Sequence, residues 1–142
     1  MAALGPNAMH TRNVLIADDH TAIRKGLRSL IEAHDSLKVI AEAADGAEAV
    51  EKTEKLRPDL VVLDLTMPNL DGLAAARQIK KVLPKTLIVI FSMHAFKEVV
   101  ETAKQAGVQG FVSKSQDGDE LLAAIDAVFE NRSYFPGLTT PN

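Results

Sequence analysis

The sequence predicts an α/β domain, in which helices cover both faces of a parallel β-sheet. Short apolar runs of strand length alternate with longer segments whose apolar residues recur at helical spacing, through five successive strand–helix units. The runs at residues 14–17, 60–63 and 87–91 are continuously apolar, as is typical of strands buried on both faces. Four of the strands are also followed by, or end in, a side chain that can take part in chemistry: Asp18, Asp64, Ser92 and Lys114. These features favour a doubly wound sheet.

The first part of the chain supplies two strand–helix units. Residues 1–12 show no periodicity, and we expect them to form a disordered leader. After strand 14–17 we expect a helix over about residues 21–33, with Ile23, Leu27, Leu30 and Ile31 facing inward and Arg24, Lys25 and Arg28 facing water. A second strand is expected near residues 37–43. The turn Asp45-Gly46 then starts a second helix, which ends before Pro58 and has as apolar positions Ala47, Val50 and Leu56.

The second part supplies three more units. Strand 60–63 leads through the loop 67–72 to a helix with three inward residues, Leu73, Ala76 and Ile79. Strand 87–91 precedes a helix at about residues 96–106, and strand 110–113 precedes a helix at about residues 119–130. We therefore expect one domain over residues 13–131, and residues 132–142 to be a C-terminal tail or the start of a linker.

Composition limits the classes of function. The length of 142 residues suits one domain with one core, and 46% apolar with 25% charged residues is ordinary for a folded protein. Cysteine is absent, which excludes disulfides and thiolate metal sites. The net charge of −3 gives no general reason to bind nucleic acid or an acidic membrane. No apolar run approaches the ~20 residues of a membrane span, and no export signal is recognisable, so we expect a cytoplasmic protein that does not contact membranes.

The polar residues that follow the strands suggest a phosphoryl-transfer site. Open α/β sheets bind ligands at the carboxyl edge of their strands, where Asp18, Asp19, Asp64, Ser92 and Lys114 are all expected. Two or three carboxylates suit Mg²⁺, which prefers oxygen ligands and keeps several waters. Asp64 is then a candidate nucleophile that forms an aspartyl phosphate. Mg²⁺ and Lys114 would neutralise phosphoryl oxygens, and Ser92 would donate a hydrogen bond to another.

Each of these residues also has an ordinary explanation. Asp18-Asp19 could cap the first helix, since aspartate is favoured there. Asp64 and Ser92 could be loop residues, and an isolated lysine such as Lys114 is most often a solvated surface residue. Their joint placement, each just after its own apolar strand or at its end, favours the functional interpretation.

The chain resembles the receiver domains of two-component response regulators. The matching segments are Leu15-Ile16-Ala17-Asp18-Asp19-His20, Val61-Val62-Leu63-Asp64-Leu65-Thr66-Met67-Pro68 and Asp71-Gly72, together with Ser92 and Lys114. Residues 41–46 and 92–94 are similar to the LuxR/NarL-like subgroup, whose members carry LuxR-type DNA-binding domains. The resemblance covers about residues 13–131. It implies a flavodoxin-like (βα)₅ fold of five parallel strands in the order 2-1-3-4-5.

The resemblance also implies a role for each site residue. Asp64 would accept the phosphoryl group, and Lys114 would contact it. Mg²⁺ would be held by Asp19 directly, by Asp18 largely through water, by Asp64 and by the main-chain carbonyl of Thr66. Ser92 would move to bond the phosphoryl group, and Phe111 would be the switch aromatic that turns inward when Ser92 moves. An ordinary core role for Phe111 is the alternative.

The implied function is that of a signalling switch. A sensor histidine kinase would phosphorylate Asp64, and the domain would then control an output, with homodimerisation on phosphorylation as a further expectation. Nucleic acid would be bound only through a LuxR-type output domain outside these 142 residues. The domain would catalyse only its own phosphorylation and dephosphorylation, so it would not be an enzyme in the usual sense.

Three features depart from the family pattern. Ser115 stands where many members have proline after the lysine, Met93 is bulkier than the small residue often found after the switch hydroxyl, and Phe111 lacks a tyrosine hydroxyl.

Three alternative functions are open. One alternative is a single-domain regulator that acts through protein–protein contacts. Another is a receiver-like binding module that is not phosphorylated, against which the full residue set argues. The third is a phosphotransferase of the haloacid dehalogenase type, which would need a general acid where Thr66 stands.

Overall fold

A single parallel sheet forms the centre of the molecule. The computed structural model describes residues 11–114 and 118–136. In these ranges five strands form a sheet in the order β2-β1-β3-β4-β5, and every neighbouring pair is parallel. The predicted fold class and strand order are therefore confirmed.

Strands and helices alternate strictly along the chain. The strands are β1 (Arg12–Ala17), β2 (Leu37–Ala43), β3 (Leu60–Leu63), β4 (Leu87–Ser92) and β5 (Gly110–Ser113). The helices are α2 (Thr21–Glu32), α3 (Gly46–Leu56), α4 (Gly72–Val82), α5 (Lys97–Gln105) and α6 (Gly118–Phe129). The expected helix limits differ from these by only one residue or so at each end, as is usual for helix ends.

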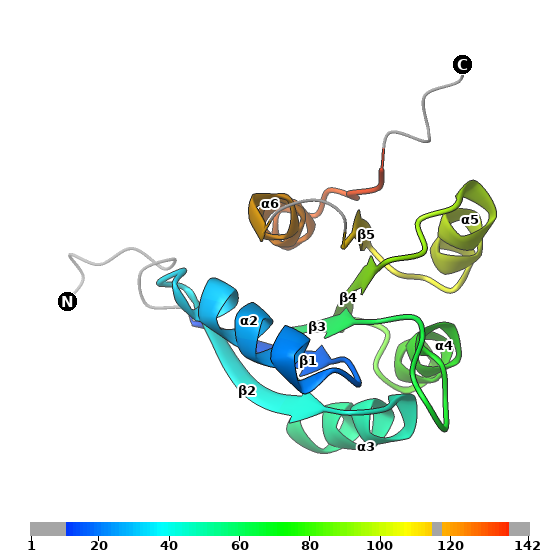
Figure 1. Cartoon of the computed structure of the whole chain (residues 1–142), viewed down its shortest axis with the longest axis horizontal. Helices are drawn as coiled ribbons and strands as arrows, with labels where there is room; N and C mark the ends of the chain where they lie inside the picture. The colour runs from blue at the N-terminus through cyan, green and yellow to red at the C-terminus, as the bar shows by residue number, and fades with distance from the viewer. Residues whose placement is uncertain (1–10, 115–117, 137–142) are drawn as a thin grey trace.

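Two apolar cores lie on opposite faces of the sheet. Helices α2 and α6 cover one face, and α3, α4 and α5 cover the other (Figure 1). Successive strand residues point to alternate faces, so Val14 and Ile16 join the first core while Leu15 and Ala17 join the second. This double burial explains why the central strands are continuously apolar in sequence.

Some residues expected to face the core or the solvent lie elsewhere. Ile23 and Leu56 are exposed, with 36% and 43% of their surface accessible, and Ala47 is exposed as well. On α3 the buried positions include Ala49 and Thr53 besides the expected Val50. Helical spacing fixes which residues share a face, but the rotation of the helix on the sheet is set by packing.

The chain after α6 returns to the sheet. Tyr134 forms a parallel bridge with Gly110, its N–H donating to the Gln109 carbonyl at 3.0 Å and its carbonyl accepting from the Phe111 N–H at 2.8 Å. The Tyr134 ring packs on the α2/α6 core, and Phe135 packs on the opposite core. Part of the segment expected to be a tail or linker thus covers the outer edge of β5. The expected leader lies outside the described residues except at its end, where Arg12 already belongs to β1.

None of the helices in the described part of the chain has the length and apolar character needed to span a bilayer.

Gly72 permits a close approach of two segments at the start of α4. A Cβ at this position would lie 2.0 Å from the carbonyl oxygen of Asp64 and 2.8 Å from the Cα of Leu65. The Gly72 N–H donates to the Leu65 carbonyl at 2.8 Å, so α4 begins directly against the main chain that carries Asp64. No side chain fits there unless this main chain moves.

We expect Gly72→Ala to destabilise the protein by more than ~2 kcal/mol, because its methyl group overlaps main-chain atoms that cannot rotate away. Gly26→Ala is the matched control, since a Cβ at Gly26 in α2 meets nothing within 4 Å. Alanine is favoured over glycine within a helix, so this control should gain about 0.5–1 kcal/mol. Urea unfolding measures both changes, and equal midpoints for the two variants would contradict the steric explanation.

Candidate functional site

Main-chain hydrogen bonds fix the residues that follow the strands. The Asp18 N–H donates to the Ala43 carbonyl at 3.0 Å, and the Asp64 N–H donates to the Ala17 carbonyl at 2.9 Å. These bonds extend the β1–β2 and β1–β3 ladders beyond the last paired residues. The two aspartates are therefore held at one edge of the sheet, as the sequence predicts.

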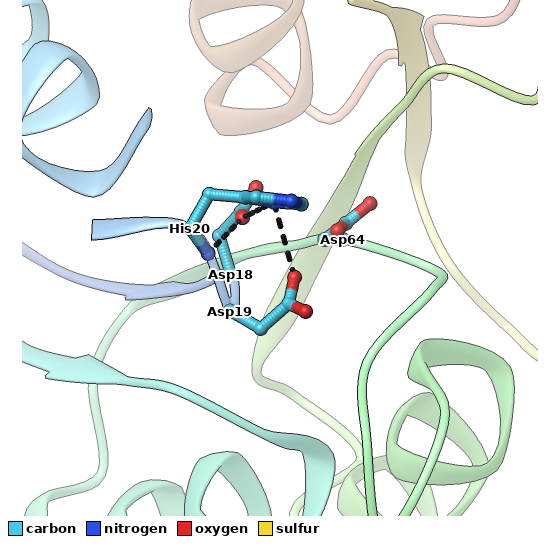
Figure 2. A group of neighbouring side chains, drawn as sticks. All are labelled: Asp18, Asp19, His20 and Asp64. Atoms are coloured by element: carbon cyan, nitrogen blue, oxygen red, sulfur yellow. Dashed lines mark hydrogen bonds and ion pairs between the residues drawn. The ribbon is translucent and has the colours of Figure 1, made fainter. Parts of the chain in front are cut away.

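Three carboxylates and one imidazole converge at this edge. Asp18, Asp19, His20 and Asp64 each place a potential ligand atom within 4.8 Å of the others. Figure 2 shows the Asp64 side chain beside the other three, with the His20 ring joined to both neighbouring carboxylates. Its Nδ1 lies 3.1 Å from an oxygen of Asp18 and 3.1 Å from an oxygen of Asp19. The carboxylate oxygens are the ligand type that Mg²⁺ prefers, so this donor set fits that ion.

Lys114 joins the buried carboxylates. Its ammonium lies 2.7 Å from Asp18 Oδ2 and 3.4 Å from Asp64 Oδ2. The side chains of Lys114, Asp18 and Asp64 are only 9%, 1% and 5% exposed, whereas that of Asp19 is 32% exposed. Lys114 is thus a buried ion-pair partner and not a solvated surface lysine. The main-chain N–H of Lys114 donates to the Ser92 carbonyl at 2.8 Å, which continues the β4–β5 ladder.

The surroundings of Asp64 disfavour its negative charge. Burial raises the pKa of this carboxyl above its ordinary value, and the nearby Asp18 charge adds to the rise. The Lys114 ammonium acts in the opposite direction without cancelling it. A raised pKa means that the neutral form of the Asp64 carboxyl is favoured over its usual balance. Additional positive charge beside Asp64 would stabilise the ionised form.

The remaining predicted residues lie around this centre. Ser92 ends β4 and is fully buried, and its Oγ accepts a hydrogen bond from the His94 N–H at 3.0 Å. Phe111 is also fully buried and packs in the core on the α3–α5 face. Thr66 is exposed in the loop after β3. The bond between Lys114 and Ser115 lies outside the described residues.

Two residues near the site had no role in the sequence-based prediction. His20 directly follows the aspartate pair, and a histidine beside two carboxylates is a recognisable signal. Arg24 was expected to face water, yet its side chain is only 15% exposed, and its Nη1 donates to the Asp18 carbonyl at 2.6 Å. No sequence pattern would have indicated this contact. Arg24 lies on α2, whereas Glu42, the residue that orients it, lies on β2.

Residues 14–126 match the response regulator receiver domain. This chain belongs to that family. The resemblance seen in the sequence is therefore confirmed, and the receiver domain has the acidic pocket at which such domains generally bind Mg²⁺.

Individual relatives point to the LuxR/NarL group. The chain is 38% identical over 109 residues to the uncharacterised transcriptional regulatory protein YhcZ of Bacillus subtilis, covering 77% of this chain and 51% of that one. A LuxR-family response regulator from Aurantimonas has a similar structure, with a TM-score of 0.84 at 40% identity, over 87% of this chain and 89% of that one. The signal receiver domain of the putative response regulator NarL from Mycobacterium tuberculosis gives a TM-score of 0.82 at 30% identity, over 87% and 99%.

The receiver domain spans only about half the length of the curated relatives it matches. Residues 14–126 account for the family match.

Removal of the Asp64 charge should stabilise the domain in metal-free buffer. The folded-state pKa of Asp64 is raised, so its ionised form costs stability above that pKa, and the cost disappears as pH falls through it towards the unfolded value near ~3.9. We expect Asp64→Asn to have a higher urea midpoint than wild type at pH 7.5, and the difference to shrink on acidification. Asp35→Asn removes an exposed carboxylate and serves as the control. A lower midpoint for Asp64→Asn at pH 7.5 would contradict the assigned effect of burial.

Proposed function

We propose that this receiver domain is a phosphorylation switch in which Asp64 accepts the phosphoryl group and Mg²⁺ is held by Asp18, Asp19, Asp64 and the carbonyl of Thr66. The observation that carries the proposal is the buried Lys114 ammonium, which lies against Asp64 and Asp18 with Asp19 nearby. A purely structural ion pair needs no third carboxylate, and this site has one in Asp19, whose side chain is 32% exposed. The arrangement suits a reaction that brings negative phosphoryl oxygens to Asp64.

The transfer requires little covalent help from the protein. A carboxylate oxygen of Asp64 forms a bond to phosphorus as the bond from phosphorus to the donor breaks, and the donor keeps that electron pair. Lys114 is close enough to bond a phosphoryl oxygen on Asp64, because it already lies 3.4 Å from Oδ2. Mg²⁺, when bound, would supply further positive charge for the phosphoryl oxygens. Asp64 must be ionised to react. Burial raises its pKa and so disfavours the ionised form, which a cation bound beside Asp64 would favour.

We infer that the domain catalyses phosphoryl transfer only to and from its own Asp64 and does not turn over a separate substrate. A hydrolase of the haloacid dehalogenase type needs a general acid two positions after the acceptor, and the hydroxyl of Thr66 cannot serve as one. We therefore infer self-phosphorylation and self-dephosphorylation on Asp64, with a sensor histidine kinase as the donor in the cell. Membership of the family supports this partner and a cytoplasmic location.

The output is proposed to be transcriptional. The relatives include proteins named as transcriptional regulators, and the chain corresponds to about half of their length. We infer that a LuxR-type DNA-binding domain accompanies the receiver domain in the whole protein, and that phosphorylation promotes homodimerisation. The second candidate is a single-domain regulator that acts through protein contacts.

Acetyl phosphate with Mg²⁺ should add one phosphoryl group to the wild-type chain and none to Asp64→Asn. The reason is that Asp64 is a buried carboxylate that lies beside the Lys114 ammonium and beside the Asp18–Asp19 pair proposed to hold Mg²⁺. Intact-mass measurement detects the addition, and Asp35→Asn should behave as wild type. Equal phosphate uptake by Asp64→Asn would remove this residue from the proposed role.

Ser92 is the proposed link between phosphorylation and a change of shape. Its Oγ accepts from the His94 N–H in this structure, and a phosphoryl group on Asp64 would offer it a different partner. A contact made in only one of two states is what a population shift requires. Phe111 would then adjust by packing alone, and its main chain is bonded to Tyr134 at the edge of the sheet.

We expect Ser92→Ala to accept phosphate on Asp64 but to lose more than about half of the conformational response, since the hydroxyl contact specific to the phosphorylated state is gone. Hydrogen exchange over residues 94–111, with and without the phosphate mimic BeF₃⁻, measures the response. Ser29→Ala on the exposed side of α2 is the control. A full response in Ser92→Ala would show that this residue does not couple the two events.

A further inference from the structure

Arg24 connects the acidic pocket to the second strand. It lies in the first turns of α2, and its guanidinium contacts both the loop after β1 and a side chain of β2. Nη1 donates to the Asp18 carbonyl at 2.6 Å, and Nε donates to Glu42 Oε1 at 3.0 Å. One planar group thus bonds the main chain of a pocket residue and a carboxylate from another element.

The contact completes the main-chain bonding of Asp18. The Asp18 N–H is bonded to the Ala43 carbonyl of β2, while the Asp18 carbonyl lies beyond the last paired residue of β1. Arg24 supplies the donor that this carbonyl would otherwise take from water. The Arg24 N–H also donates to the His20 carbonyl at 3.0 Å, which begins the helix. Arg24 therefore contacts both ends of the turn from Asp18 to His20.

Glu42 fixes the orientation of Arg24. Its two carboxylate oxygens accept from two arginines, Oε1 from Arg24 and Oε2 from Arg28 at 2.9 Å. Lys52 Nζ donates to the Glu42 carbonyl at 2.6 Å, so the main chain of Glu42 is held as well. Burial works to raise the pKa of Glu42, but the hydrogen bonds and charges of Arg28 and Arg24 outweigh it and leave this pKa below its ordinary value. Glu42 is thus a charged anchor at neutral pH.

We propose that Arg24 is a positioning residue for the metal site, where it holds the Asp18–His20 turn so that Asp18 and Asp19 converge with Asp64, and that Glu42 in turn holds Arg24. The inference rests on the proposed function, because it concerns the same Mg²⁺ site. Groups that orient the ligands of a metal commonly contribute about 10–100-fold to its affinity. Without Arg24 the turn loses its one side-chain bond to the Asp18 carbonyl among the described residues, and the two carboxylates sample more positions.

Arg28 is a close control for this role. It lies one turn further along α2 with the same charge, and it shares the partner Glu42. Its second ion pair is with Glu32 at 3.5 Å and not with a pocket residue. Arg24→Gln and Arg28→Gln therefore remove equal charge from the same helix face. Only Arg24→Gln also removes the bond to Asp18.

Calorimetric titration of the full chain with Mg²⁺ alone, at fixed ionic strength, tests the proposal. We expect Arg24→Gln to weaken Mg²⁺ binding on the order of tenfold and Arg28→Gln to change it little. Arg24→Lys keeps the charge, but an ammonium cannot reproduce the planar pair of bonds to the Asp18 carbonyl and to Glu42. Its Mg²⁺ affinity should therefore lie between those of wild type and Arg24→Gln. A rise in affinity for Arg24→Gln would mean that Arg24 acts only as a nearby repelling charge, and would overturn the proposal.

Hydrogen exchange without metal gives an independent measurement. The His20 N–H donates to Asp18 Oδ1 at 2.8 Å, so its exchange reports the order of the turn. It should exchange faster in Arg24→Gln than in Arg28→Gln. If Arg24→Gln fails to fold, Glu42→Gln should show the same two changes in weaker form, and wild-type behaviour of that variant would count against the proposal.

The outcomes separate this inference from the proposed function. If wild type binds no Mg²⁺ and takes no phosphoryl group from acetyl phosphate, the proposed function fails. If wild type does both, while Arg24→Gln and Arg28→Gln bind Mg²⁺ equally well, only the positioning role of Arg24 is wrong.

Discussion

The pairing of one ammonium with two buried carboxylates is the interaction on which this site depends. Asp18 and Asp64 are almost fully buried, and Lys114 contacts both of them. Two carboxylates this close would repel each other strongly in a region from which water is largely excluded, and an unpaired buried charge is costly. Lys114 offsets much of that cost but supplies one positive charge against three carboxylates, since Asp19 belongs to the same group. The pocket therefore folds with an excess of negative charge that a divalent cation would balance.

The order of the strands decides that these groups meet. Asp18 follows β1 and Asp64 follows β3, which are neighbours, whereas Lys114 follows β5, which is separated from β3 by β4. Lysine has a long flexible stem, and this length lets its ammonium reach across the end of β4 to both aspartates. The main chain of the site is meanwhile held by bonds that continue the ladders and by the contact of Gly72 with Asp64. The chemical groups are thus carried by main chain that is hydrogen-bonded to the edge of the sheet.

Both outer strands of the sheet connect to the site through specific contacts. On the β2 side, Glu42 and Arg24 reach the carbonyl of Asp18. On the β5 side, Tyr134 bonds the main chain of Phe111 and its hydroxyl donates to Glu120 of α6, while Lys104 of α5 lies over the Phe135 ring at 4.9 Å. An exposed sheet edge is a liability, and the returning segment covers this one. It also places the residues after α6 in direct contact with the strand that ends at Lys114.

The sequence alone determined the alternation of strands and helices, because continuous apolar runs and helical periodicity are local patterns. It also placed Asp18, Asp19, Asp64, Ser92 and Lys114 at one edge of the sheet, because the carboxyl ends of parallel strands share an edge wherever the strands lie. Tertiary structure decided the rest. The spacing of Arg24 on its helix suggested solvent, yet its partners Glu42 and Asp18 come from different elements, and only packing brings them together. The exposure of Ile23, the burial of Thr53 and the return of Tyr134 to the edge of β5 likewise depend on how helices and segments dock on the sheet. Such contacts join residues far apart in the chain, and no local pattern encodes them.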